Sequence, residues 1–457
     1  MKSVMPKRVT NFIAFSTLIV LFSSIGLVSA NFAFMFTDKI YQGVFVDQLP
    51  LGGLSIDKAA ERVSNSYQSK TKNKPLLILK YQSQTWTISP EDIDLNINTT
   101  ETALNAYNVG RSGTLIENLT ERYYSLNSGI NVPYSLSYDK AKLSSILNRI
   151  VAPINKEPKN ATVAIQGSSV DIIPETNGHM IDISKLLEIC DEQMRTSINA
   201  EINLQFEVIK PQITNQDLVQ IDSVIASYTT EFDQSHNNRA QNIYLAAKSL
   251  DGLLVKSGEI ISFNELVGPR VEESGFKEAP VFIEGKIVPD WGGGVCQVSS
   301  TLYNAAVLAD LEIIERTSHF RPPAYVPVGR DATVADNLID FKFKNSLENA
   351  IYILTKTTGS KLTVYIIGKQ INTAPEIEII TTDSKSIEPS TIIKQDRNLA
   401  FGKRVIETEG QKGINITTHR IRKVNGVEIS REFLAYDEFK PVDKVIVVGT
   451  KTTSSNK

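Results

Sequence analysis

DWGGGVCQVSSTLYN, residues 290–304, sets one of the two cysteines of the chain between three glycines and a helical pattern. Apolar side chains recur after Cys296 at helical intervals, at Val298, Leu302, Ala305 and Ala309. We therefore expect Cys296 in or beside the first turn of a helix, where unpaired N–H groups and the helix dipole favour a thiolate. The glycines would let a substrate backbone approach this thiol closely. The alternative is a glycine turn followed by a small buried cysteine.

The second cysteine follows a different pattern. One face of a helix would carry Ile183, Leu186, Leu187, Cys190 and Met194. This spacing predicts that Cys190 belongs to a hydrophobic core. Two cysteines this far apart in the sequence are not a disulfide framework. There is no CxxC, HExxH or paired Cys/His spacing, so we expect no metal site, and no motif calls for a cofactor.

Length and charge limit the class of protein. A chain of 457 residues should hold several domains. Its 48 basic and 51 acidic residues give a net charge of -3, which provides no electrostatic argument for binding nucleic acid.

The N-terminus combines a short basic segment with a long uncharged one. Residues 1–8 contain Lys2, Lys7 and Arg8, and residues 9–36 contain no charged side chain. Such a run is long enough to span a bilayer, and the preceding basic residues favour a cytoplasmic N-terminus. We expect a membrane anchor with the remainder of the chain outside the cell. The small residues ending at Ala30 leave open a cleaved signal peptide, which would release a secreted protein.

The first part of the exported region contains an internal repeat. LSIDKA at residues 54–59 recurs as LSYDKA at 136–141, and in each copy the serine is positioned to cap a helix. TWTISP ending at Pro90 and VDIIP ending at Pro174 also match as strands. We interpret these similarities as two copies of one α+β module, at residues 40–125 and 130–212.

Two further regions follow. Residues 215–370 alternate helical and strand patterns, which predicts a mixed α/β domain with a hairpin at Thr358-Gly359-Ser360. Residues 376–452 are polar and rich in strand patterns, with an Asn-Gly hairpin signal at Val424-Asn425-Gly426-Val427. The predicted fold class is thus multidomain α+β, ending in a small all-β module.

Several motifs resemble known bacterial families. NIYLAAKSLDG, GEIISFNELVGPR, GGGVCQVSSTLYNAA, SHFRPPAYVPVGRDATV and IDFKF, between residues 242 and 368, resemble the VanW domain family. LGGLSIDKA and AYNVGRSG resemble the peptidoglycan-binding modules that usually precede a VanW domain. GKRVIETEGQKG, VNGVEISRE and VVGT resemble the five-glycine domain of bacterial surface proteins. This resemblance implies a cell-wall protein, expected in a Gram-positive bacterium, with peptidoglycan as its partner.

The same resemblance implies a reaction, because some clostridial members are credited with L,D-transpeptidase activity. We expect Cys296 to be the nucleophile that forms a thioester with a stem peptide. His319 is the best candidate for its base, because His236 lies in a polar stretch and the other two histidines lie in other modules. Asp331 is expected to orient His319, with Asp336 and Asp340 as nearby alternatives.

A further set of residues is expected to contact the substrate: Trp291, Gly293, Gly294, Arg321 and Arg330. Backbone N–H groups near Gly294 could hold an oxyanion, and the arginines, with Arg316, could bind substrate carboxylates. For Trp291 core packing is an equal alternative, and for the arginines a solvated surface. The better-known L,D-transpeptidases carry serine, histidine and glycine before their cysteine, unlike residues 292–295 here, so a shared fold is not expected. Two other functions stay open, a noncatalytic wall-binding scaffold and a wall cysteine peptidase.

Overall fold

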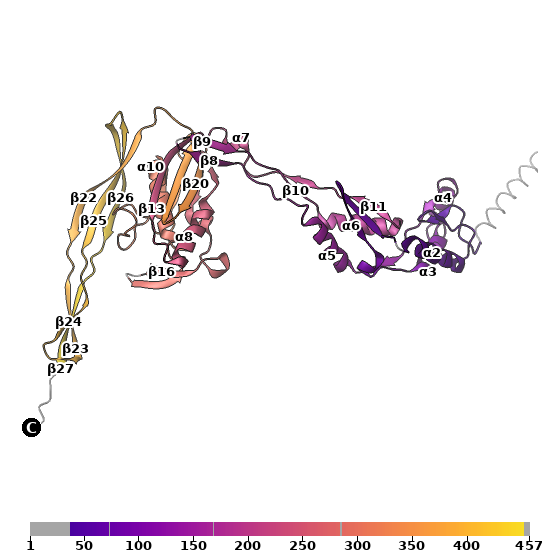
Figure 1. Ribbon diagram of the computed structural model, residues 1–457, viewed down its shortest axis with the longest axis horizontal. Helices are drawn as coiled ribbons and strands as arrows, with labels where there is room; N and C mark the ends of the chain where they lie inside the picture. The colour runs from indigo at the N-terminus through magenta and orange to yellow at the C-terminus, as the bar shows by residue number, and fades with distance from the viewer. Residues whose placement is uncertain (1–36, 73, 168, 284–285, 452–457) are drawn as a thin grey trace, which may run out of the picture. The chain divides into compact units, whose positions relative to one another are not determined.

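The computed structural model describes residues 37–72, 74–167, 169–283 and 286–451 (Figure 1). The chain divides into two compact units. The first ends at Pro158 and resumes over Asn177–Lys210, and the second comprises Lys159–Thr176 and everything from Pro211 onward. The expected cytoplasmic segment 1–8 and membrane anchor 9–36 lie outside the described residues. Across the described part, no helix is both long and apolar enough to cross a membrane.

The first unit combines helices with small sheets. Its helices are α2 (Ile56–Thr71), α3 (Thr99–Asn108), α4 (Leu115–Asn127), α5 (Lys140–Val151), α6 (Ile183–Thr196) and the 3-10 turn η1 (Pro90–Ile93). Its strands are β1 (Val44–Val46), β2 (Leu49–Pro50), β3 (Leu77–Tyr81), β4 (Gln84–Ile88), β5 (Asn96–Ile97), β6 (Ile130–Asn131), β7 (Leu136–Ser137), β10 (Gly178–Met180), β11 (Ala200–Asn203) and β12 (Glu207–Ile209).

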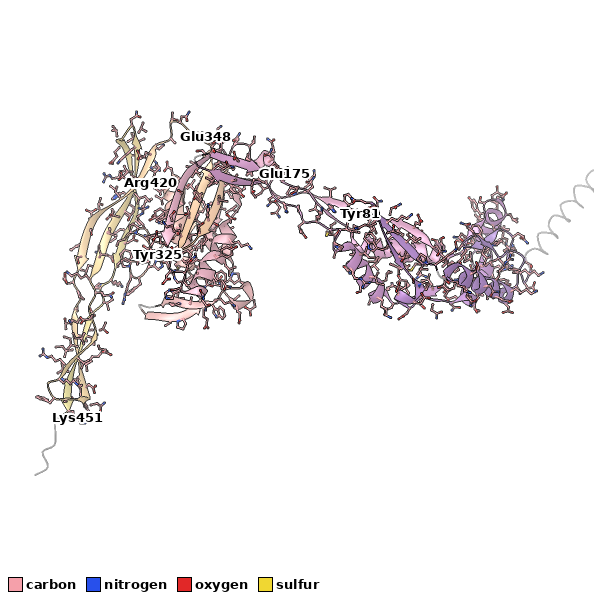
Figure 2. The ribbon with its side chains drawn as sticks, viewed as in Figure 1. Tyr81, Glu175, Tyr325, Glu348, Arg420 and Lys451 are labelled. Atoms are coloured by element: carbon pink, nitrogen blue, oxygen red, sulfur yellow. The ribbon has the colours of Figure 1, made fainter. Side chains whose placement is uncertain are left out.

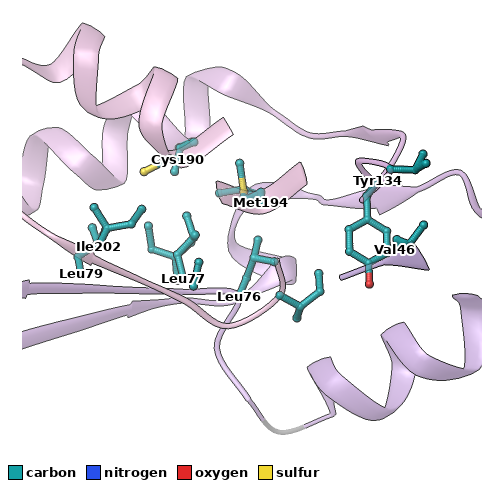
Figure 3. Packing of buried hydrophobic residues seen from close by; sticks show 14 of the residues in the cluster. Val46, Leu76, Leu77, Leu79, Tyr134, Cys190, Met194 and Ile202 are labelled. Carbon is teal, nitrogen blue, oxygen red and sulfur yellow. The ribbon is translucent and has the colours of Figure 1, made fainter. Parts of the chain in front are cut away.

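Cys190 lies in the core of this unit, as its spacing predicts (Figure 3). On α6 the buried positions are Leu186, Cys190 and Met194, and all three belong to the same cluster as the strand residues Leu77 and Leu79. Figure 3 shows Cys190 and Met194 on the side of the helix that faces these strand residues. Cys190 is fully buried and has no disulfide partner. Its role is packing.

The two predicted serine caps have different outcomes. Ser55 occupies the N-cap position of α2, but its side chain makes no capping hydrogen bond. In the second copy Ser137 ends β7, and α5 is capped instead by Asp139, whose carboxylate accepts the N–H groups of Ala141 and Lys142. A carboxylate next to the first turn caps at least as well as a hydroxyl, and its charge also suits the positive end of the helix dipole.

The two copies of the repeat share one hydrophobic core. Buried hydrophobic residues drawn from both modules, between Ile40 and Leu204, form a single cluster. Strand β11 of the second predicted module also pairs in parallel with β3 of the first. The strand β9 (Ser169–Ile173), which contains VDII, lies in the second unit instead. The module boundaries 40–125 and 130–212 stay a prediction.

The second unit begins with the hairpin of β8 (Thr162–Gln166) and β9 and continues from Pro211. Its helices are α7 (Asn215–Leu218), α8 (Asn237–Leu250), α9 (Phe263–Val267), α10 (Val295–Leu308) and the 3-10 turn η2 (Glu272–Ser274). Its strands up to residue 368 are β13 (Ser223–Glu231), β14 (Leu253–Val255), β15 (Ile260–Ser262), β16 (Glu278–Ile283), β17 (Lys286–Trp291), β18 (Glu312–Glu315), β19 (Lys342–Lys344), β20 (Ile351–Thr358) and β21 (Lys361–Gly368).

A six-stranded sheet in the order β14-β20-β21-β13-β9-β8 supports this unit. Strands β20 and β21 form the hairpin predicted at residues 358–360. Their side chains alternate: Ile353 and Ile366 enter the cluster with the helices, whereas Tyr352 and Ile367 enter a separate cluster. Helices α8 and α10 pack on the sheet and against each other (Figure 1).

The C-terminal domain, residues 376–451, is all β. One sheet holds β22 (Glu376–Ile387), β25 (Gly413–Val424) and β26 (Val427–Phe439); the other holds β23 (Thr391–Ala400), β27 (Lys444–Lys451) and β24 (Arg404–Thr408). The Asn-Gly hairpin predicted at residues 424–427 joins β25 to β26, and both turn residues have positive φ.

Helix α10 is buried nearly all round, although its sequence predicted only one apolar face. Every residue from Val295 to Val307 except Cys296 is buried. One side packs on β13 and β21, and β22 of the C-terminal domain also contacts the helix. A helix enclosed by neighbours on several sides has no solvated face. Cys296 at its N-terminus and Leu308 at its C-terminus are the positions left partly exposed.

Candidate active site

Cys296 is the second residue of α10, as its spacing predicts. The helix begins after Gly294, which holds a φ of +108° that few side chains tolerate. The thiol donates to the Val334 carbonyl at 3.4 Å. That carbonyl belongs to the long loop between β18 and β19, so this loop lies over the helix N-terminus.

The glycine triplet packs against the protein itself. A Cβ at Gly293 would lie 2.8 Å from the carbonyl oxygens of Ala279 and Pro280, and one at Gly294 would lie 3.0 Å from Arg239. The buried Asn242 fixes the turn by donating to the Gly293 carbonyl at 3.0 Å. The absence of side chains here is therefore required by internal packing, a reason that the sequence interpretation of close substrate approach did not include.

His319 and Asp331 meet in the β18–β19 loop. One oxygen of Asp331, Oδ2, lies 2.6 Å from His319 Nδ1 and accepts the His319 backbone N–H at 2.6 Å. The Asp331 side chain is fully buried and that of His319 is 16% exposed. Asp336 and Asp340, the alternatives from the sequence, pair elsewhere: Asp336 with Arg270, and Asp340 with Ser262.

His319 also contacts Cys296, and this contact shifts the pKa of both groups. Burial opposes ionisation of the thiol, but a hydrogen bond from His319 and its charge bring the pKa of Cys296 below its usual range. Burial likewise disfavours the imidazolium, but the hydrogen bonds to Asp331 and Cys296 raise the pKa of His319 to about 9. Both shifts favour a thiolate beside an imidazolium, the state that a cysteine nucleophile needs.

Several neighbours of this pair were not predicted. The Tyr325 hydroxyl lies 3.5 Å from His319 Nε2, and Figure 2 labels this residue. Burial followed by the charge of Cys296 raises the pKa of Tyr325. Arg239 donates to the buried Gln297 at 2.7 Å, and Arg270 is 8% exposed. Both arginines interact with the charge of Cys296. Arg239 lies outside the quoted motifs, and Arg270 ends the motif GEIISFNELVGPR, which gives no indication of this contact.

The predicted substrate-binding side chains have internal contacts. Arg330 donates to Asn304 at 2.7 Å, and its guanidinium lies 5.0 Å from the centre of the Tyr228 ring. Arg321 lies 3.5 Å from Gln411 of the C-terminal domain. Trp291 packs partly buried against the core of the unit. His236, the rejected base, is an exposed partner of Asp233.

The described residues contain no group of three or more His, Cys, Asp or Glu side chains arranged to hold a metal ion.

We expect iodoacetate to alkylate Cys296 alone in the folded chain, with a bell-shaped pH dependence. The rate should rise where the thiolate forms, below the usual thiol range, and fall near pH 9 as His319 loses its proton. Burial raises the pKa of Cys190 to about 12, so Cys190 should react only after unfolding. Peptide mass spectrometry measures both sites, with Cys296→Ala as the control. Faster labelling of Cys190 would contradict the expectation.

Known families match three regions of the chain. The family described as VanW like protein matches residues 238–367, which contain Cys296, His319 and Asp331. A peptidoglycan binding domain family matches residues 86–203, which includes parts of both predicted modules. The G5 domain family matches residues 378–451.

A relative extends this similarity over more of the chain. The uncharacterized protein YoaR of Bacillus subtilis (strain 168) is 33% identical over 241 residues, which are 52% of this chain and 78% of YoaR. The chain belongs to the VanW family. The predicted family is thereby confirmed. With its peptidoglycan binding and G5 regions, this VanW-family chain is a cell-wall-associated protein.

Two other proteins resemble parts of the VanW-family chain. The vancomycin B-type resistance protein VanW of Enterococcus faecalis (strain ATCC 700802 / V583) is 34% identical over 151 residues, which are 32% of this chain and 55% of that protein. The solved IgA1 protease G5 domain shares 27% identity with a TM-score of 0.15, and the match covers 18% of this chain and 98% of that domain.

Proposed function

We propose that the chain is a cysteine-dependent L,D-transpeptidase that cross-links peptidoglycan stem peptides. The observation that carries this proposal is the arrangement of Cys296, His319 and Asp331 at the partly exposed N-terminus of a buried helix. A nucleophile, a base and an orienting carboxylate in contact form the constellation used for acyl transfer. The peptidoglycan binding region supports stem peptides as the acyl donor and acceptor.

In the first half-reaction, the Cys296 thiolate attacks the carbonyl carbon before the terminal D-alanine of a tetrapeptide stem. Backbone N–H groups of Gly294 and Cys296 stabilise the oxyanion, which is worth about 3 to 4 kcal/mol per good donor. The His319 imidazolium gives its proton to the leaving nitrogen as the C–N bond breaks. D-Alanine departs and a thioester remains on Cys296.

In the second half-reaction, the side-chain amine of a neighbouring stem attacks the thioester. Neutral His319 accepts the proton of this amine, the new amide forms, and the thiolate of Cys296 leaves. Asp331 keeps its charge throughout and holds the His319 ring in one tautomer. Trp291, Gly293, Arg321 and Arg330 remain proposed contacts for the stem peptides.

The location of the chain is part of the same proposal. Residues 9–36 would anchor it in the cell membrane with residues 1–8 in the cytoplasm. The bulk of the chain would then be held outside the cell, where peptidoglycan is accessible. Cleavage after Ala30 would give a secreted form instead.

Incubation with tetrapeptide muropeptides tests the function. The wild-type chain should produce a dimer one D-alanine lighter than two monomers, detected by mass spectrometry, and Cys296→Ala should produce none. Cys190→Ala is the matched control, because Cys190 is buried in the first unit and should not affect the reaction.

Two results would contradict transpeptidation. Shortened monomers without dimers would show that water resolves the thioester, which is the activity of a cysteine peptidase. Unchanged muropeptides together with binding to purified cell wall would identify a noncatalytic scaffold.

A further inference from the structure

We propose that Asp437 of the C-terminal domain is a positioning residue for the His319–Asp331 pair and acts through Arg316. The C-terminal domain would then complete the active site in addition to any binding function of its own. This inference rests on the proposed function in treating His319 and Asp331 as catalytic groups.

Arg316 joins the two carboxylates. Its Nη2 donates to Asp331 Oδ1 at 3.1 Å and its Nε donates to the Asp331 carbonyl at 2.5 Å. Its Nη1 donates to Asp437 Oδ1 at 2.5 Å. The side chains of Arg316, Asp331 and Asp437 are only 5%, 0% and 4% exposed. Little water can therefore screen the charges of this chain of contacts.

Other contacts hold the C-terminal domain in place beside this chain. Arg420 of β25 is 2% exposed and donates to the Leu311 carbonyl at 2.7 Å, just after α10 (Figure 2). Thr418 donates to the Gly329 carbonyl at 3.1 Å, two residues before Asp331. A Cβ at Gly329 would lie 2.6 Å from the Thr418 hydroxyl, so the loop approaches β25 closely. Asp437 is thus presented to Arg316 by a docked strand.

The bonding of Asp437 argues against a purely structural ion pair. Its second oxygen, Oδ2, is buried and has no hydrogen-bond partner within the described residues. A buried carboxylate with one oxygen that lacks a hydrogen-bond partner costs free energy, so such a group contributes little if it serves only to join two surfaces. Its single strong contact is to the arginine that binds the acid of the His319 pair. With Asp437 present, the positive charge of Arg316 is shared between two carboxylates, so Arg316 neutralises Asp331 less. Asp331 then stabilises the His319 imidazolium more strongly.

The electrostatic environment of His319 comes from several elements. His319 and Asp331 interact with Cys296 of α10 and with Arg316. The further charged and titratable groups near these four residues are Tyr303 of α10, Tyr325 and Arg330 of the β18–β19 loop, Arg239 of α8, Arg270 after α9, and Asp437 of β26. Among the four arginines, Arg316 contacts Asp331 directly. Loss of Asp437 should therefore affect His319 mainly through this contact.

Titration of His319 by NMR in the full chain tests the inference without turnover. The sequence has only four histidines, and His319→Gln assigns the signal. In the wild type the pKa of His319 should lie near 9. In Asp437→Asn we expect this pKa to fall by about one unit, the scale for loss of one partly buried charge, because Arg316 then compensates Asp331 more completely. Asp437→Glu keeps the charge and should largely restore the wild-type pKa.

Glu432→Gln is the matched control. Glu432 lies on the same strand and pairs with Arg420 and Arg422, so it stabilises the same domain contact without touching Arg316. In the Glu432→Gln variant the pKa of His319 should equal that of the wild type. An equal shift in Glu432→Gln would overturn the inference in favour of loosened docking, and an unshifted His319 in folded Asp437→Asn would overturn it directly.

A replacement variant and a parallel activity assay complete the test. Should Asp437→Asn fail to fold, Asp437→Ser leaves room for water beside Arg316, and the same shift of the His319 pKa is expected. A shift in a chain that yields no cross-linked dimers would support the positioning role and refute transpeptidation. A normal pKa in an active Asp437→Asn chain would refute the positioning role alone.

Discussion

Asp331→Asn should lower the rate of dimer formation by about 10³- to 10⁴-fold. The Asp331 carboxylate accepts the His319 ring at 2.6 Å and stabilises its charged form. An asparagine amide would lose that charge and can present an N–H to Nδ1, which selects the wrong tautomer; in a comparable triad the same change costs about 10⁴-fold. The measurement is the initial rate of cross-linking under saturating muropeptide, compared with the wild type.

The chain contains a matched control for this variant. Asp233 and His236 form a second His–Asp pair in the same unit, 3.3 Å apart, with side chains 62% and 63% exposed. Asp233→Asn should leave the rate within about twofold, because an exposed pair contributes little. Equal losses in both variants, or full activity in a folded Asp331→Asn chain, would remove Asp331 from the mechanism.

Arg420→Ala should destabilise the contact between the C-terminal domain and α10 by about 1 to 3 kcal/mol, the range for leaving a buried hydrogen-bond acceptor without its donor. The guanidinium is 2% exposed, pairs with Glu432 at 2.8 Å and donates to the Leu311 carbonyl. Its removal leaves the Leu311 carbonyl without this donor, whereas Glu432 keeps its pairing with Arg422. Urea unfolding of the full chain, followed through the protease sensitivity of residues 376–451, measures the change.

Arg431→Ala is the corresponding surface control. Arg431 pairs with Glu428 at 3.0 Å on the next strand, where both side chains are 40% exposed or more. Its removal should change the free energy of unfolding by less than about 1 kcal/mol. The docking described here would be wrong if the two variants had the same midpoint of urea unfolding.

Local patterns in the sequence were sufficient to predict several elements and the position of Cys296. The spacing after Cys296 predicted the start of α10, the spacing around Cys190 predicted its burial, and glycine signals predicted two hairpins. Each of these features depends on residues within a few turns of one element. The pairing of His319 with Asp331 could also be predicted, because the two residues are close in sequence within one loop.

Features that depend on tertiary contact could not be predicted in this way. Arg239 and Arg270 approach Cys296 from α8 and from the segment after α9, and Asp437 of β26 binds Arg316. No local pattern distinguishes Arg239 or Asp437 from surface charges, and the motif that ends at Arg270 does not indicate its contact. The glycines illustrate the same limit. Sequence alone indicated an open approach beside Cys296, whereas the opposing Ala279 and Pro280 carbonyls are visible only in three dimensions.

The pairing of β13 with β21 has a consequence for biosynthesis. Thr229 and Thr363 are neighbours across these two strands although 134 residues separate them in the chain. Because synthesis proceeds from the N-terminus, residues 361–368 must be made before β21 can pair with β13. Until then β13 lacks this partner in the central sheet. Contacts of such long range slow folding, and they leave strand edges open to other chains. We expect the second unit to complete its fold only after its synthesis and to depend on molecular chaperones in the interval.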